Sequence, residues 1–307
     1  MPEQKKEFNN IKIHTQYSIC EGAIKIDDLA EYCKQNKIKS IGLSDTNNLC
    51  GALEFAEKIS KVGTQPIIGT QINLFYENLI GKITLYAASE KGYKNLTKLS
   101  SLSYLKKRST HEPCCSIEDL ISNNEDLLLL TGNYSNFFGK LFYANKEKII
   151  NKIITKLKNS FSNRIYIEIQ RHGENQELNF ENFLLNLSSL YALPLIASQE
   201  VYYLDPSMSE AHDALICIGE KQFIDDPNRF RYSKEHHFKN NEEIQKLYKD
   251  IPEALENNYN FPKRFHFKPK KSKPILPSIL NSKNISAVSE LTNQAKVGLD
   301  IRIKNIN

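Results

Sequence analysis

Seven short apolar runs, spread over the first two hundred residues, limit the folds that this chain can adopt. They cover 11–14, 40–44, 66–73, 82–87, 126–131, 164–169 and 194–198. Each run is nearly continuous in apolar residues, as expected of a strand that is buried on both faces. Helical patterns occupy most of the intervals, at 26–36, 51–61, 89–104, 146–159, 175–191 and 207–219. This alternation predicts an α/β fold around a parallel sheet, and the length of 307 residues suits a closed barrel.

The pattern changes after about residue 222. Residues 240–260 predict two short helices split at Pro252, and a final helix is predicted at 286–300. The basic run Lys263–Lys273 is interpreted as a proline-broken linker, with a phosphate-binding patch as the alternative. We therefore expect a barrel domain at 1–270, followed at 271–307 by a linker and the first helix of a further part that lies outside this chain.

Composition places the chain among globular proteins. The apolar share is 40%, the net charge is only +5, and no apolar run approaches the roughly 18 residues of a membrane span. The start, MPEQKKEFNN, has no apolar core and does not predict a secretory signal. Six cysteines without a CxxC pair are interpreted as reduced thiols. These features predict a cytoplasmic protein that has no membrane partner.

Polar side chains stand at or just after the ends of six of the seven predicted strands. They are His14, Asp45, Gln71, Asn133, His172 and Glu200. In an α/β barrel, the carboxyl ends of the strands form one rim, where catalytic groups collect. Loops are polar in any protein, so one or two such residues would indicate nothing. Polar side chains at six of the seven strand ends therefore suggest a functional site at this rim.

The segment Ile11–Gly22, read IKIHTQYSICEG, resembles the opening motif of the PHP (polymerase and histidinol phosphatase) phosphoesterases. In that family the strand reads H-x-H and both imidazoles bind metal. Here the first position is Lys12, whose protonated amine has no lone pair to offer a metal.

Further motifs extend the resemblance over nearly the whole chain, in the order SDTNNLCGALEF, QPIIGTQI, GYKNLTKLSSL, YIEIQRHG, YYLDPSMSEAHDALICIG and FIDDPNRFRY. Together they resemble the N-terminal PHP domain of the bacterial replicative DNA polymerase III alpha subunit. The resemblance implies a distorted seven-stranded (βα) barrel of PHP type, with the segment 271–307 leading towards an absent polymerase core.

Active members of the family hold two or three metal ions with about nine ligands. When the family motifs are matched to this chain, the nine ligand positions fall on Lys12, His14, Glu21, Thr46, Gln71, Asn133, His172, Glu200 and Tyr202. Asp45, which precedes Thr46 in its motif, is retained as well. His14 and His172 keep the ligand type, and Glu21 and Glu200 keep a carboxylate. The resemblance therefore implies a vestigial metal site, with no catalytic residue and no metal expected.

The retained residues also have simpler interpretations. His14 and His172 are expected to be hydrogen-bonded rim residues, and Asp45 to cap the loop before the 51–61 helix through an Asx turn. Lys12 is expected to balance Glu21 and Glu200. Tyr202 is interpreted as a packing residue, and His236–His237 as lying outside the rim set.

The resemblance implies a catalytically degenerate PHP domain in DNA replication, acting as a scaffold and as a docking site for the epsilon proofreading exonuclease. Its partners would be the polymerase III core and, indirectly, DNA. The resemblance implies that the nucleotidyltransferase chemistry of a DNA-directed DNA polymerase, with its Mg²⁺, belongs to palm carboxylates that this chain lacks. The adjacent acid pairs Asp27–Asp28 and Asp225–Asp226 are not interpreted as that site, because the first lies in a predicted helix and the second in a predicted turn. The chain alone is predicted to be inactive. One alternative is a phosphoesterase or 3′–5′ exonuclease with altered ligands and Zn²⁺ or Mn²⁺; another is a free-standing binding protein.

Overall fold

The computed structural model describes residues 6–105, 112–274 and 286–306. The chain divides into two compact units, residues 1–270 and residues 271–307. The second unit contains helix α11 (Ala287–Lys304), whose first turn is capped by the Ser286 side chain. None of the helices in the described ranges is long and apolar enough to cross a membrane.

The first unit is built around one mixed sheet. Its strands are β1 (Lys12–Ile13), β2 (Ser40–Leu43), β3 (Gln65–Tyr76), β4 (Leu79–Ala87), β5 (Cys115–Ser116), β6 (Leu127–Leu130), β7 (Ile165–Ile169), β8 (Leu195–Ala197) and β9 (Glu200–Val201). The order is β8-β7-β6-β4-β3-β2-β1-β9, and β5 pairs with β3 outside this path. Only Ser198 and Gln199 separate β8 from β9 in the chain, so the two ends of the sheet meet. The predicted α/β barrel is thus confirmed.

The expectation of a parallel sheet is wrong for one strand. β4 runs antiparallel to both of its neighbours, β3 and β6. Residues 77 and 78 alone join β3 to β4, and Glu77 adopts a positive φ of 52° in this tight turn. A parallel connection needs a dozen or more residues, so this short loop permits only a hairpin. The two-residue strands β5 and β9 give no apolar run, and sequence patterning missed them.

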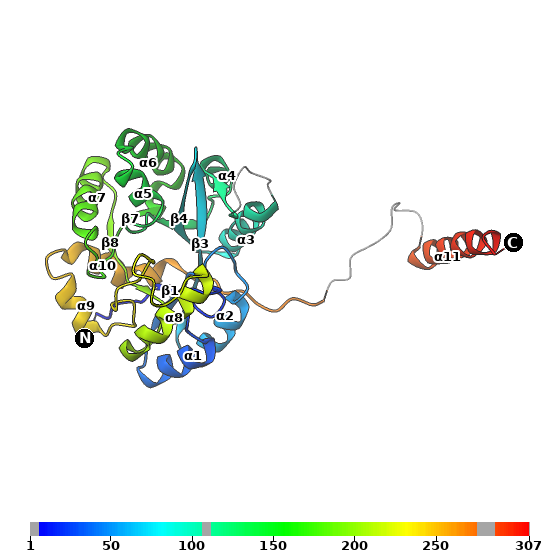
Figure 1. The fold of residues 1–307 in the computed structure, drawn as a ribbon, viewed down its shortest axis with the longest axis horizontal. Coiled ribbons are helices and arrows are strands. Elements are labelled where there is room, and N and C mark those ends of the chain that lie inside the picture. Colours follow the sequence, from blue (N-terminus) through cyan, green and yellow to red (C-terminus); the bar gives the residue numbers. More distant parts are fainter. Residues whose placement is uncertain (1–5, 106–111, 275–285, 307) are drawn as a thin grey trace. The chain divides into compact units, whose positions relative to one another are not determined.

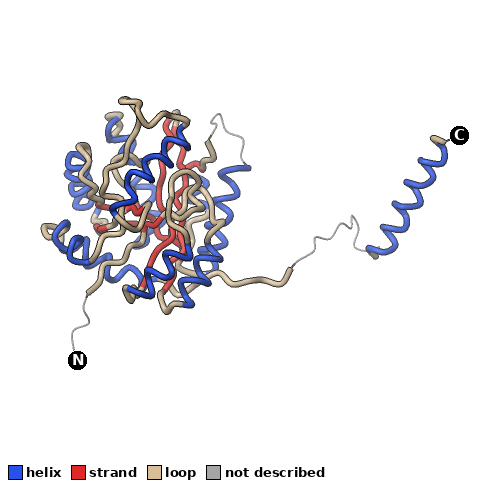
Figure 2. The backbone as a smooth tube through the Cα atoms, turned by 60° about the horizontal axis from the view of Figure 1, so that its bottom comes forward, coloured by secondary structure: helices blue, strands red, loops and turns tan. Residues whose placement is uncertain are grey.

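Helices cover the outside of the barrel (Figure 1), and Figure 2 shows the strands enclosed by them. The helices are α1 (Ile26–Gln35), α2 (Ala52–Lys61), α3 (Glu90–Leu105), α4 (Ile117–Ser122), α5 (Phe137–Tyr143), α6 (Glu147–Phe161), α7 (Glu177–Tyr191), α8 (Ser209–Glu220), α9 (Asn241–Leu247) and α10 (Pro252–Asn260). Their apolar faces meet the sheet; α2, for example, buries Phe55, Ala56 and Ile59. This burial is the main source of helix stability here, because short isolated helices are marginal in water.

The start of the basic run is part of the barrel, which corrects its interpretation as a linker. A 3₁₀ turn at Phe261–Arg264 follows α10. Phe261 and Phe265 are buried, and both rings pack edge-on against Tyr86 of β4. The Gln65 side-chain amide also donates to the Phe265 carbonyl at 2.9 Å. Aromatic burial therefore holds this segment against the barrel.

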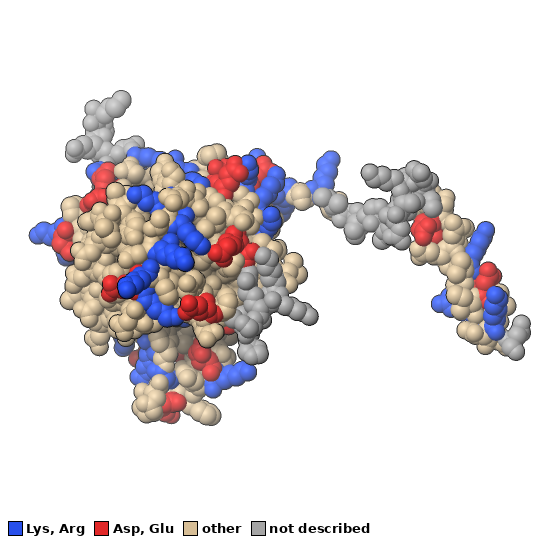
Figure 3. Space-filling model, turned by 90° about the horizontal axis from the view of Figure 1, so that it is seen from above, with Lys and Arg blue, Asp and Glu red and all other residues tan. Residues whose placement is uncertain are grey.

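Charges of both signs are interspersed on the face of the barrel domain shown in Figure 3. This agrees with the small net charge of +5. Mixed charge of this kind favours solubility and gives no reason to expect a strong electrostatic field over that face.

Candidate functional site

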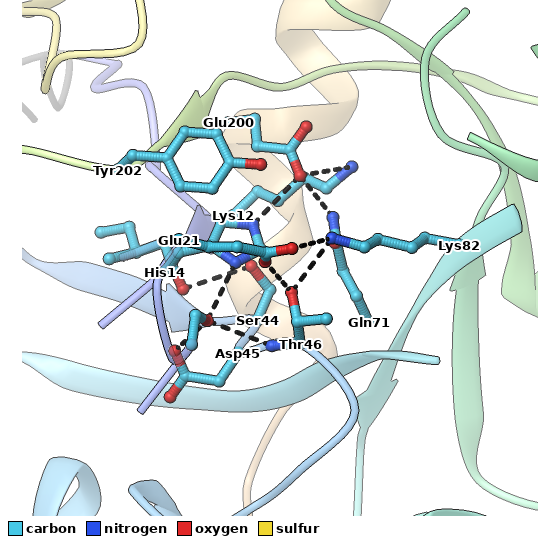
Figure 4. A network of polar contacts seen from close by, with 12 residues as sticks. Lys12, His14, Glu21, Ser44, Asp45, Thr46, Gln71, Lys82, Glu200 and Tyr202 are labelled. Carbon is cyan, nitrogen blue, oxygen red and sulfur yellow. Dashed lines mark hydrogen bonds and ion pairs between the residues drawn. The ribbon is translucent and has the colours of Figure 1, made fainter. Parts of the chain in front are cut away.

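The ten residues singled out in the sequence lie in one contact network at the strand ends. Figure 4 labels eight of them, all except Asn133 and His172. Each is joined to another member by a hydrogen bond, an ion pair, a ring contact or strand pairing. The members are Lys12, His14, Glu21, Asp45, Thr46, Gln71, Asn133, His172, Glu200 and Tyr202. We call this network the polar cluster.

Lys12 lies at the centre of the polar cluster. It belongs to β1, pairs with Glu200 of β9 in the sheet register, and is not exposed to solvent. Its Nζ lies 3.3 Å from Oε1 of Glu168 and 3.8 Å from Oε1 of Glu200. The expected pairing with Glu200 is present, but the expected pairing with Glu21 is wrong. Glu168 was missed because it lies inside the apolar run of β7, where it reads as one polar residue in a buried strand.

The Glu200 carboxylate collects more contacts than any other group of the polar cluster. His14 Nε2 lies 3.0 Å from Oε1, the Gln71 amide donates to the same oxygen, and Asn133 Nδ2 donates to Oε2 at 3.3 Å. Burial alone would raise the pKa of Glu200, but the Lys12 charge and the bond to His14 hold this pKa well below its usual range. Glu200 is therefore an anion whose lone pairs are already engaged by protein groups.

A second lysine, Lys82, forms an ion pair with the Glu21 carboxylate. Lys82 reaches from β4 and places Nζ 2.6 Å from Oε1 of Glu21, while the Thr46 hydroxyl donates to Oε2. Burial opposes ionisation of Glu21, but the charges of Lys82 and His14 and the hydrogen bonds from Lys82 and Thr46 together outweigh it and lower the pKa of this carboxyl. Lys82 was missed because nothing in the sequence of a hairpin strand shows which carboxylate a lysine will meet.

Asp45 holds the loop after β1 rather than the loop before α2, so its expected Asx turn is wrong. Its carboxylate accepts from the Thr15 amide at 2.7 Å, from the Thr15 hydroxyl at 2.8 Å and from the Ser18 hydroxyl at 2.8 Å. Ser18 in turn lies 3.2 Å from His14 Nδ1. Burial raises the pKa of Asp45, and these hydrogen bonds oppose the shift. The contacts fix the loop that carries Glu21.

His172 and His236 form a buried stack, with ring centroids 4.0 Å apart and an interplanar angle of 6°. The Glu200 amide donates to His172 Nε2 at 3.2 Å, and His236 Nδ1 donates to the Glu200 carbonyl at 2.9 Å. Burial lowers the pKa of His172 to about 3 and that of His236 well below its ordinary value. His236 therefore belongs to the polar cluster, contrary to expectation.

Tyr202 packs as expected, and it covers the ring of His14 at a centroid distance of 4.6 Å. Its hydroxyl lies 3.3 Å from that of Tyr232. Tyr202 thus places an aromatic ring and a hydroxyl, rather than a nitrogen ligand, beside His14.

A PHP-type metal cluster does not fit these residues. His14 uses both ring nitrogens, and the only lone pair of His172 Nε2 accepts from the Glu200 amide. The Gln71 amide oxygen is buried and has no hydrogen-bond partner among the described residues, but one amide oxygen is a poor metal site by itself. Within residues 6–105, 112–274 and 286–306, no group of three or more His, Cys, Asp or Glu side chains is arranged to hold a metal ion.

A family model, described as the PHP domain, matches residues 10–172, which is more than half of the chain. The chain belongs to the PHP domain family. It is 34% identical to "DNA polymerase III subunit alpha" of Caulobacter vibrioides over 97% of this chain and 27% of that protein. It is 28% identical to the protein of the same description from Escherichia coli, over 96% of this chain and 26% of that protein. The chain thus spans about a quarter of the length of these relatives.

A solved structure, described as a putative metal-dependent phosphoesterase from Bifidobacterium adolescentis, aligns with a TM-score of 0.44 and 11% identity. The alignment covers 62% of this chain and 86% of the other. This is a weak likeness.

Proposed function

We propose that this chain is a catalytically degenerate PHP domain of the DNA polymerase III alpha type, in which protein charges have replaced metal ions. In this role it serves as a structural scaffold in a replicative polymerase and as a docking site for a proofreading exonuclease. The homology to alpha subunits supports the setting in replication. The observation that carries the loss of catalysis is the buried Lys12 ammonium between Glu168 and Glu200.

Phosphodiester hydrolysis by a metal site needs bound ions that activate water and stabilise the charge that develops on the phosphate. The Lys12 ammonium adds positive charge to the cluster, but it cannot bind a hydroxide as a ligand. The carboxylates of Glu21 and Glu200, which a metal ion would need as ligands, already accept from Lys82 and Thr46 and from His14 and Gln71, respectively. Both observations support a structural role.

A metal-dependent phosphoesterase or 3′–5′ exonuclease with altered ligands is the second candidate. The retained His14, His172, Glu21 and Glu200 favour it, since all four are metal-ligand types. Zn²⁺ or Mn²⁺ would be the cofactor in that case. The polymerase reaction with its Mg²⁺ would belong to the remainder of an alpha subunit.

The two candidates differ in metal content and nuclease activity. We expect protein dialysed without chelator to contain well under one equivalent of zinc, manganese or iron by elemental analysis. We also expect it to leave single-stranded DNA intact in the presence of Mn²⁺ or Zn²⁺. Stoichiometric binding of two or more ions, with nuclease activity that Glu200→Gln abolishes and Glu210→Gln preserves, would establish the second candidate.

The docking role needs a separate measurement. We expect the chain to co-elute in size-exclusion chromatography with the proofreading exonuclease encoded in the same genome. Independent elution at micromolar concentrations would reject the docking role and leave the scaffold role standing.

A further inference from the structure

A small pocket opens beside the polar cluster, between α8 and the segment after it. Its volume is about 130 Å³, and its walls include Tyr203, His212, Arg231 and Lys234. Small-molecule and cofactor sites usually measure ~300–1,000 Å³, so this pocket suits the end of a side chain rather than a cofactor. His212 Nε2 donates to the Glu21 carbonyl at 2.8 Å and so fixes one wall of the pocket to the polar cluster.

One buried group in the pocket has no acceptor for its proton. Tyr203 is only 1% exposed and lines the pocket. The backbone amide of His236 approaches its hydroxyl, but this hydroxyl donates to no acceptor in the described parts of the chain. Buried polar groups are nearly always hydrogen-bonded, because leaving one unpaired forfeits the bonds it makes to water. The Tyr203 hydroxyl is therefore a donor available to an incoming acceptor.

The charges around the pocket favour an anion. Arg231 and Lys234 are exposed at its mouth, and neither forms an ion pair with a described residue. Asp213 is paired with Arg229 through both oxygens and also interacts with the charge of Arg231. Glu210 is the exposed carboxylate of the wall that forms no ion pair with a described residue. The pocket therefore offers two cations without an ion-pair partner, Arg231 and Lys234, and the Tyr203 hydroxyl as a donor, while Glu210 is its exposed carboxylate. This balance of charge favours a negatively charged occupant.

An exposed apolar surface adjoins the pocket. We call it the Ile218 surface; it comprises Ile19, Ile218, Phe223, Ile224 and Phe230, which are 82%, 71%, 86%, 50% and 50% exposed. The Phe230 ring packs edge-on against Tyr232 of the pocket wall, and Arg231 donates to the Ile224 carbonyl. A gathering of large exposed apolar side chains beside a polar pocket is typical of a protein–protein contact.

We propose that the pocket and the Ile218 surface bind a segment of a partner protein in which apolar residues flank an acidic side chain. The carboxylate enters the pocket, accepts from the Tyr203 hydroxyl and faces Arg231 and Lys234. The apolar residues cover the Ile218 surface. Charge complementarity selects this occupant, and binding does not depend on whether the polar cluster holds metal, so the two proposals fail independently.

The test uses tripeptides as probes, followed by ¹⁵N–¹H correlation spectra of the labelled full chain. Ac-Leu-Glu-Phe-NH₂ should give saturable shifts at residues 203, 209–216 and 231–234, with a dissociation constant below about 10 mM. The neutral Ac-Leu-Gln-Phe-NH₂ should bind at least tenfold more weakly. A third probe, Ac-Leu-Gln-Phe with a free carboxyl terminus, carries its negative charge on the chain terminus. Comparing it with the Glu probe shows whether the pocket binds an acidic side chain or a terminal carboxylate.

Variants then assign the contacts. Arg231→Gln/Lys234→Gln should weaken binding of the Glu probe at least tenfold, and Tyr203→Phe several-fold. Lys94→Gln on α3 changes charge elsewhere and should leave binding unchanged. The double variant alters only exposed residues and keeps the fold, so it remains decisive if Tyr203→Phe unfolds.

Three outcomes would overturn the proposal. They are shifts that do not saturate or fall elsewhere, equal binding of the Glu and Gln probes, and tightest binding of the probe with the free carboxyl terminus. Undiminished binding to the double variant would remove the assignment of the cations.

Discussion

The Lys12 ammonium lies 3.3 Å from a carboxylate oxygen of Glu168, and neither side chain has any exposed surface. Both residues lie in strands, so the sheet fixes the distance between their backbones independently of the side-chain rotamers. Glu168 is held further by the Gln170 amide, which donates to Oε1 at 2.7 Å, and by the Ser198 hydroxyl. A buried ion pair of this kind adds modestly to stability when complete and becomes costly when one partner is removed.

Lys12→Met should therefore destabilise the protein strongly. The change leaves Glu168 and Glu200 buried without their cation, and we expect the free energy of unfolding to fall by about 3–5 kcal/mol. Chemical denaturation followed by circular dichroism measures this fall. Lys12→Met/Glu168→Gln should recover part of it, because the glutamine stays hydrogen-bonded and uncharged.

Lys94→Met is the matched control for Lys12→Met. Lys94 forms an exposed pair with Glu90 on α3, and its loss should change the denaturation midpoint little. Equal stability of the Lys12→Met variant and the parent would contradict our account of the polar cluster.

Stability should fall as the pH is lowered from 6.5 towards 3. Burial lowers the pKa of His172 from an ordinary 6.5 to about 3. Below pH 6.5 this histidine binds a proton in the unfolded chain but not in the folded chain, so acid favours unfolding. Above pH 6.5 it is neutral in both states, and its full contribution to the free energy of unfolding is present. Between pH 6.5 and pH 5 this one histidine should account for a loss on the order of 2 kcal/mol.

Urea melts of His172→Gln measure this pH effect. The variant should show a flatter dependence on pH between 6.5 and 5 than the parent, while the exposed His266→Gln should keep the parent's dependence. A steep, unchanged dependence in His172→Gln would assign the effect to other groups.

Lys12→His should not create a metal site. The substitution restores one imidazole, but Thr46, Gln71 and Tyr202 still supply neither imidazole nor carboxylate, and His14 and Glu200 keep their hydrogen bonds. Addition of Co²⁺ should give no d–d absorption band at stoichiometric metal. A saturable band at one equivalent would show that the remaining donors suffice.

Gly42→Ala should disrupt the pairing between β1 and β2. A Cβ at Gly42 would lie 2.0 Å from the Ile11 carbonyl oxygen, and the three nearest atoms all belong to the Ile11 backbone, which cannot move aside as a flexible side chain could. We expect a loss of several kcal/mol, of the order found for overpacked cores or more. Gly298→Ala in α11 meets only the end of the Arg302 side chain at 3.7 Å and should leave the main unfolding transition unchanged. A folded Gly42→Ala protein with the parent's denaturation midpoint would contradict the register of these strands.

The barrel could be predicted from the sequence because its strands are buried on both faces and so form continuous apolar runs. The rim could be predicted because His14, Asp45 and Glu200 lie at the ends of such runs or within two residues of them. The hairpin of β3 and β4 was readable in principle, since eight residues between the runs at 66–73 and 82–87 leave no room for a helix.

Partners within the polar cluster could not be predicted in the same way. Glu168 and Lys82 both lie in strands, and their contacts depend on sheet order and on side-chain length across the barrel. His236 comes from a loop without periodicity. The pairing of residues 203 and 237 and its hydrogen bonds to Tyr202 and Glu200 bring it against His172. Such contacts are a property of the closed barrel rather than of any local pattern.

The meeting of β1 with β9 has a consequence for the order of events during synthesis. Lys12 pairs with Glu200, so β1 lacks its second neighbour until residues 200 and 201 have left the ribosome. Until then Lys12 also lacks Glu200, and for most of that time it lacks Glu168. Contacts so distant in sequence slow folding and leave strand edges open in the nascent chain. Although β1 precedes the other described strands in the chain, it is thus among the last of them to be completed, and until then its lysine must stay hydrated.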